Sequence, residues 1–73
     1  MEKNADLIAL GARVRTLREE RDLTQEELAA RAGLSANYVG EIEGGKRNPS
    51  ALVLFALARG LDVHPSTVMI ANE

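Results

Sequence analysis

The chain has 73 residues, of which 45% are apolar and none is cysteine. This length supplies one small core, so we expect a single domain over residues 1–73, and disulfides and thiolate metal sites are excluded. The net charge of -2 argues against strong non-specific attraction to nucleic acid. The longest apolar run, residues 51–58, is too short for a membrane span. With no signal-peptide pattern either, we expect a protein of the reducing cytoplasm.

Amphipathic segments alternate with short polar connections and predict an all-α fold of five helices. The expected helices cover residues 5–21, 25–32, 36–43, 51–59 and 65–71. Thr24, Ser35 and Ser50 precede the second, third and fourth helices as N-cap residues, and Pro65 opens the fifth. A connection rich in glycine, asparagine and proline ends the third helix.

Two charged residues lie on helix faces that should point into the core. Arg18 follows the apolar Val14 by four residues, and Glu43 follows Val39 by four residues. Because an unpaired buried charge is costly, we infer that Arg18 and Glu43 form a structural ion pair. The alternative is that both side chains are exposed near helix ends.

Two short helices within residues 24–44 are joined by a tight connection. Thr24 and Glu27 form a T-x-x-E capping box, Ser35 caps the next helix, and Gly33 supplies the positive φ that the reversal needs. This arrangement predicts a helix-turn-helix unit, whose second helix enters the major groove of double-stranded DNA. The alternative is a corner between two helices in another all-helical domain.

The segments LTQEELAARAG, SANYVGEIEGGKRNPS and LARGLDV together resemble the DNA-binding domain of the lambda-repressor and Cro-like family, also called Xre-like. The resemblance runs from about residue 10 to residue 69 and implies a five-helix domain with a central helix-turn-helix. It also implies the pairing of Arg18 with Glu43. The combination of YVG at 38–40 with KRN at 46–48 is similar to the small controller proteins of restriction-modification systems.

The outward face of the third helix carries the residues expected to contact bases: Ala36, Asn37, Gly40 and Glu41. Asn37 can pair with adenine, Glu41 can accept from the exocyclic amine of cytosine, and Ala36 can touch a thymine methyl. Gly40 keeps the helix close to the base edges. A carboxylate near phosphates lowers affinity unless a cytosine compensates, so an ordinary solvated role for Glu41 stays open.

Contacts to the phosphate backbone are expected on either side of this helix, from Thr24, Gln25, Ser35, Tyr38, Lys46 and Arg47. The family resemblance implies backbone binding at Thr24 and Gln25, and Gln25 also lies at a helix N-terminus, where amides favour an anion. Lys46 and Arg47 follow the third helix in a loop that would straddle one strand. Their alternative role is that of solvated loop charges.

The fourth helix is apolar on nearly every side, which predicts a covering surface. In a chain this short we expect a second copy, held by an interface on the C-terminal helices (51–71) that comprises Leu52, Val53, Phe55, Ala56, Val63, Val68, Met69 and Ile70. A two-fold dimer would place two recognition helices about 34 Å apart and would select a palindromic operator. The alternative is a helix wrapped more fully by its own chain.

Catalysis is not expected, because the single histidine, His64, has no histidine or cysteine partner for a metal site or a nucleophile pair. No cofactor is expected either. The predicted function is a homodimeric, sequence-specific DNA-binding transcriptional regulator that acts as a repressor or autoregulator. The alternative is a protein-interaction module, such as an antitoxin or an adaptor. A protein partner, RNA polymerase or a toxin, stays open.

Overall fold

The structure is a computed structural model that describes residues 4–69. Within this range it contains no strand and five helices: α1 (Ala5–Glu20), α2 (Gln25–Ala32), α3 (Ala36–Glu43), α4 (Ala51–Leu61) and α5 (Pro65–Met69). The predicted all-α fold is confirmed. None of these helices combines the length and apolar character that crossing a bilayer requires.

The bounds of α2 and α3 agree with the prediction, whereas α1 and α4 differ from it at their C-terminal ends. α1 ends at Glu20 rather than at residue 21, and α4 continues to Leu61 beyond the predicted end at residue 59. The extension of α4 is closed by Asp62, which adopts the left-handed conformation at φ 58°. Residues 70 and 71 of the predicted fifth helix lie outside the described residues.

Side-chain caps fix where the central helices begin. The Thr24 hydroxyl accepts the Glu27 amide at 3.0 Å, and the Glu27 carboxylate accepts the Thr24 amide at 2.8 Å, so the capping box is complete. Ser35 and Ser50 each accept the backbone amide three residues ahead. The expected caps of α2, α3 and α4 are therefore confirmed.

The turn between α2 and α3 depends on Gly33, which ends α2 at a positive φ of 70°. The amide of Leu34 then bonds back to the carbonyl of Ala29 at 2.9 Å, which closes the C-terminal turn. The chain reverses at once and α3 begins at Ala36. This local chemistry produces the helix-turn-helix that the sequence predicts.

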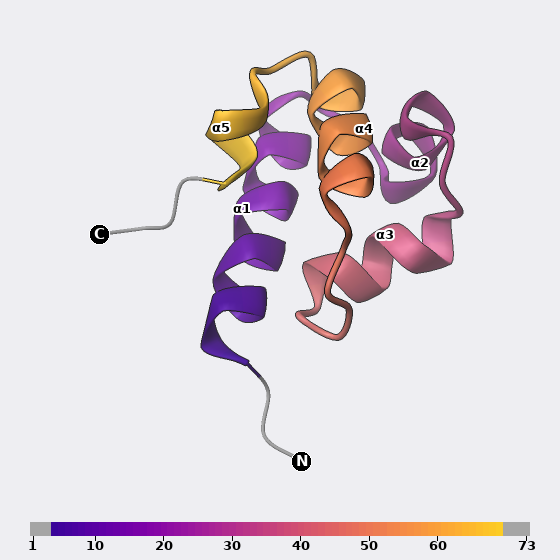
Figure 1. Cartoon of the computed structure of the whole chain (residues 1–73). Helices are drawn as coiled ribbons and strands as arrows, with labels where there is room; N and C mark the ends of the chain where they lie inside the picture. The colour runs from indigo at the N-terminus through magenta and orange to yellow at the C-terminus, as the bar shows by residue number, and fades with distance from the viewer. Residues whose placement is uncertain (1–3, 70–73) are drawn as a thin grey trace.

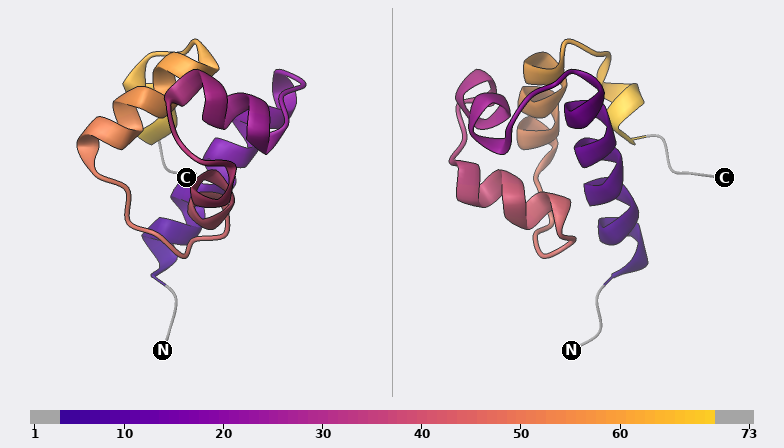
Figure 2. Two further views of the ribbon diagram at one scale, coloured as in Figure 1. Left: turned by 90° about the vertical axis from the view of Figure 1, so that its right-hand side faces the viewer. Right: turned by 180° about the vertical axis from the view of Figure 1, so that it is seen from behind.

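α2 and α3 lie on one side of the molecule and α5 on the other, with α1 and α4 between them (Figure 1). α2 packs on α4, α3 packs on α1 and α2, and α5 closes over α4 and α1. The buried core draws on all five helices and comprises Val14, Leu17, Leu28, Ala29, Val39, Ile42, Leu57, Ala58, Leu61 and Val68. Seen from the side of α2 and α3, α3 lies at the surface (Figure 2, left).

A close approach between α1 and the C-terminal end of α3 sets the position of α3. A Cβ atom on Gly11 would lie 2.6 Å from the carbonyl oxygen of Glu43 and closer still to that of Ile42. Both atoms belong to backbone, so neither can move aside as a flexible side chain would. Only glycine at position 11 allows this packing, and the sequence analysis did not identify it.

Candidate nucleic-acid interface

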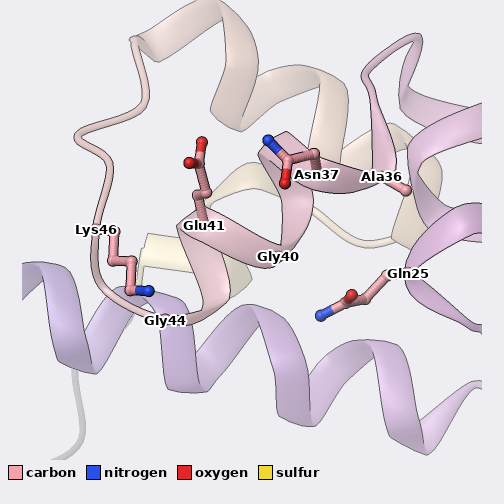
Figure 3. Close-up of a pocket in the computed structure, with 7 residues that line it drawn as sticks. All are labelled: Gln25, Ala36, Asn37, Gly40, Glu41, Gly44 and Lys46. Atoms are coloured by element: carbon pink, nitrogen blue, oxygen red, sulfur yellow. The ribbon is translucent and has the colours of Figure 1, made fainter.

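An open hollow of about 330 Å³ lies along the exposed side of α3 and is lined by Gln25, Ala36, Asn37, Gly40, Glu41, Gly44 and Lys46 (Figure 3). All the residues expected to contact bases therefore share one surface. Gln25 reaches this surface from the start of α2, and Lys46 reaches it from the loop that follows α3. The hollow thus brings the expected base contacts together with two of the expected phosphate contacts.

Asn37 and Glu41 extend from the same side of α3, one turn apart (Figure 3). Gly40 lies between them and next to Gln25, since a Cβ at position 40 would be 3.4 Å from the Gln25 amide oxygen. That distance is an ordinary van der Waals contact, so Gln25 packs directly beside α3 at this position. The resulting face carries an amide and a carboxylate, the groups that pair with adenine and with cytosine in the major groove.

Beneath this face the structure brings Arg18 and Glu43 together. Arg18 Nε donates to Glu43 Oε2 at 2.7 Å and Nη2 donates to Oε1 at 3.1 Å, while Nη1 donates to the Leu23 carbonyl at 2.7 Å. The Glu43 side chain is only 4% exposed. Hydrogen bonding to Glu43 raises the pKa of the Arg18 guanidinium above its ordinary value, against partial burial that lowers it. Two charges that would be costly alone satisfy each other.

Gln25 joins this buried pair, which the sequence did not reveal. Its Nε2 atom donates to Glu43 Oε1 at 3.0 Å, so the carboxylate holds one side chain from α1 and one from α2. One hydrogen of the Gln25 amide is thereby used. Among residues 4–69 the second hydrogen and the amide oxygen have no hydrogen-bond partner, and the bond to Glu43 fixes the direction in which they point.

The two basic residues after α3 have different surroundings. Lys46 extends along the hollow (Figure 3). Arg47 instead donates from Nε to Glu41 Oε1 at 2.9 Å, and its guanidinium carbon lies 5.6 Å from the centre of the Tyr38 ring. Glu41 and Arg47, which the sequence suggests as separate base and phosphate contacts, therefore meet in one ion pair.

Thr24 and Ser35, two further expected phosphate contacts, are both exposed at helix starts. Their hydroxyl oxygens already serve as N-caps, to Glu27 and Tyr38 respectively. An N-cap hydroxyl accepts a backbone N–H and retains its own O–H as a donor. Both residues can therefore cap a helix and donate to a phosphate at the same time.

The apolar surface of α4 and α5 is smaller than the sequence suggests. Leu52, at 77% exposure, Phe55 and Met69 point outward. Val68 is 1% exposed and Ala56 is also buried, so both side chains face the core of their own chain and leave little surface for a partner. The reason is that α4 is covered by α2 and α5 of the same chain.

The remaining residues of the expected dimer interface divide into two groups. Val53 and Val63 are half-buried against the core, and Ile70 lies outside the described residues. An open apolar hollow of about 140 Å³ separates α4 from α5 and is lined by Ala51, Leu54, Phe55, Pro65 and Met69. On α4 and α5 the exposed large apolar side chains are therefore those of Leu52, Phe55 and Met69.

Residues 14–68 match the helix-turn-helix family over most of the chain. The chain belongs to the Xre-like helix-turn-helix family. This helix-turn-helix protein is 44% identical over 65 residues to an HTH-type transcriptional regulator, y4dJ, of Sinorhizobium fredii, and the match covers 88% of this chain and 84% of that one. It is 39% identical over 62 residues to the immunity repressor protein of Bacillus phage phi105, where the match covers 85% of this chain but only 43% of the repressor.

The fold of this helix-turn-helix protein is also found in a solved structure, the restriction-modification controller protein C.AhdI from Aeromonas hydrophila. The two are 43% identical with a TM-score of 0.88, and the alignment covers 89% of this chain and 98% of C.AhdI. The resemblance to controller proteins that the sequence suggests is confirmed. Because the match covers 89% of this chain, it is not limited to the central two helices.

Proposed function

We propose that this protein is a sequence-specific, double-stranded DNA-binding transcriptional regulator that binds a palindromic operator as a homodimer and acts by occupying a promoter. The observation that carries the proposal is the hollow along α3, where Asn37 and Glu41 extend from the same side of a capped, surface-exposed helix. These two side chains can distinguish base pairs by hydrogen bonds in the major groove.

The surroundings of the hollow fit a DNA backbone on either side of α3. Gln25 lies at the N-terminus of α2, where free amides and the helix dipole favour an anion. Lys46 lies beyond the other end of α3 and brings a positive charge. With a net charge of -2, the protein should bind non-specific DNA weakly, so its affinity for an operator depends heavily on base contacts.

The apolar residues Leu52, Phe55 and Met69 support a dimer. Exposed apolar side chains that gather on one surface commonly mark an interface. The hollow between α4 and α5 adds a depression to this surface. α5 lies on the opposite side of the molecule from α2 and α3 (Figure 1), so contact between two copies there leaves α3 free. An isologous pair of recognition helices then reads two half-sites.

Selection of binding sites from a randomised duplex pool tests the proposal. At about 0.1 M salt, where phosphate attraction is partly screened, we expect enrichment of a palindrome by the wild-type protein. Asn37→Ala and Glu41→Ala should each relax the preference at particular positions. If no sequence is enriched, the proposal fails, and a protein-binding role for the same face, such as that of an antitoxin, takes its place.

Sedimentation at micromolar concentration tests the dimer separately. Leu52→Lys should shift the protein toward monomer, because it places a charge in the apolar surface. Ala30→Lys is the matched control, since Ala30 is exposed on α2 and away from that surface. A wild-type protein that sediments only as a monomer would exclude the dimer, whatever the outcome of the selection.

A further inference from the structure

Arg47 is held against the recognition helix by two residues of α3. Its Nε atom donates to Glu41 Oε1 at 2.9 Å, and its guanidinium lies over the Tyr38 ring at 5.6 Å from the centroid. Tyr38 and Glu41 are three residues apart and share one side of α3. Both contacts restrain the same planar group, so Arg47 is oriented by α3 although it belongs to the following loop.

The carboxylate of Glu41 lines the hollow along α3, where the proposed function places the major groove. A lone carboxylate there would be repelled by the phosphates on both sides of the groove. The guanidinium of Arg47 offsets that charge at hydrogen-bond distance. The pair brings a hydrogen-bond acceptor to the base edges without bringing net negative charge.

The hydrogen bond from Arg47 also orients the carboxylate. Among the residues that the structure describes, Glu41 accepts one side-chain hydrogen bond, at Oε1, which leaves Oε2 as an acceptor without a partner. In the major groove, cytosine presents its exocyclic amine as a donor, and a carboxylate oxygen is its usual partner in proteins. The geometry suits a single acceptor aimed at a single donor.

We propose that Arg47 is a positioning residue for base recognition: it neutralises and orients Glu41 so that Oε2 reads a cytosine. This inference rests on the proposed function, and it replaces the independent phosphate contact that the sequence suggests for Arg47. Lys46, the neighbouring basic residue, keeps the role of a phosphate contact because no α3 side chain holds it among the described residues.

The test compares base preference among single variants of the folded protein. The position read by Glu41 is first located as the one at which Glu41→Gln loses the cytosine preference of the wild type. There, a substituted base pair should weaken wild-type binding about 5- to 150-fold. Arg47→Ala should lose the preference at that same position, and the double variant Glu41→Gln/Arg47→Ala should lose no more than either single variant.

Lys46→Ala serves as the matched control from the same loop. It should weaken binding to all duplexes by the same factor, reduce the salt slope by about 0.9, and leave every base preference intact. Arg47→Lys separates charge from geometry: lysine retains the positive charge but lacks the planar guanidinium. It should recover general affinity without recovering the cytosine preference.

Two outcomes would overturn the inference while the proposed function stands. In one, the wild type selects an operator and Arg47→Ala behaves like Lys46→Ala, with uniform weakening and unchanged base preference. In the other, Glu41→Gln alters no base preference at all, which means that Glu41 recognises no base and Arg47 cannot position it to do so. Failure of the proposed function is a different result, since the wild-type protein then selects no operator.

Discussion

Removal of the Glu43 carboxylate should destabilise the fold much more than removal of an exposed carboxylate. In Glu43→Ala the two Arg18 donors at 2.7 and 3.1 Å and the Gln25 donor at 3.0 Å lose their acceptor. Of its hydrogen-bond partners among the described residues, Arg18 then retains the Leu23 carbonyl. Breaking a buried ion pair from one side costs about 3 to 5 kcal/mol. At about 0.05 to 0.15 kcal/mol per residue, the whole 73-residue chain has about 4 to 11 kcal/mol of stability.

Chemical denaturation followed by far-UV circular dichroism measures this loss. The helix signal is the suitable probe because the chain has one tyrosine and no tryptophan. The control is Glu19→Ala, since Glu19 pairs with Arg15 at 3.1 Å but is 54% exposed. An exposed pair contributes about 1 kcal/mol at most. A Glu43→Ala protein that unfolds at the same denaturant concentration as Glu19→Ala would refute the reasoning.

A paired substitution separates the loss of a bond from the penalty of an unpaired charge. Arg18→Met/Glu43→Leu removes both charges and puts apolar side chains of similar size in their place. Such replacements of buried pairs are often neutral or stabilising. We therefore expect the double variant to unfold at higher denaturant than Glu43→Ala. If the double variant is the less stable of the two, the penalty does not come from an unpaired Arg18.

Three further substitutions test the packing and the local signals by thermal denaturation. Gly11→Ala should abolish cooperative unfolding, because the added Cβ would overlap the carbonyls of Ile42 and Glu43. If Gly11→Ala is as stable as Gly33→Ala, the next variant, this reasoning is wrong. Gly33→Ala should cost about 1 kcal/mol, since its φ is 70° and nothing lies within 4 Å of the added carbon. Ser50→Ala removes the cap of α4 and should also cost about 1 kcal/mol, so an unchanged melting temperature would exclude a stabilising cap.

The central helices are predictable from sequence because their boundaries depend on residues close in the chain. The capping box of Thr24 and Glu27, the cap at Ser35 and the left-handed Gly33 are all local, and both α2 and α3 have the expected bounds. The end of α4 is different. It extends to Leu61 because Asp62 adopts a left-handed conformation, which aspartate takes less readily than glycine does. The local sequence signal for the end of α4 was therefore weaker, and the predicted end at residue 59 was less accurate.

Contacts between segments far apart in the sequence were harder to predict, except where a charged residue on an apolar helix face required a partner. The position of Arg18 on an apolar face indicated a partner, and the structure places that partner at Glu43, 25 residues away. No comparable conflict marks Gly11, whose importance appears only once α1 lies against α3. Ala56 and Val68 were expected at the dimer interface but are buried in the core. An apolar residue fits either environment, and helical periodicity alone does not separate the two.

Two glutamates of α3, Glu41 and Glu43, have different roles because their side chains leave the helix on different sides. Glu43 points beneath the recognition face and binds Arg18 of α1 and Gln25 of α2, so it fixes where α3 lies. Glu41 lines the open hollow and forms an ion pair with the exposed Arg47. Substitution of Glu43 should therefore reduce stability and, through it, all binding. Glu41→Gln should leave stability nearly unchanged and alter which base pair the helix prefers, so the two effects are separable by measuring unfolding and base preference on the same two proteins.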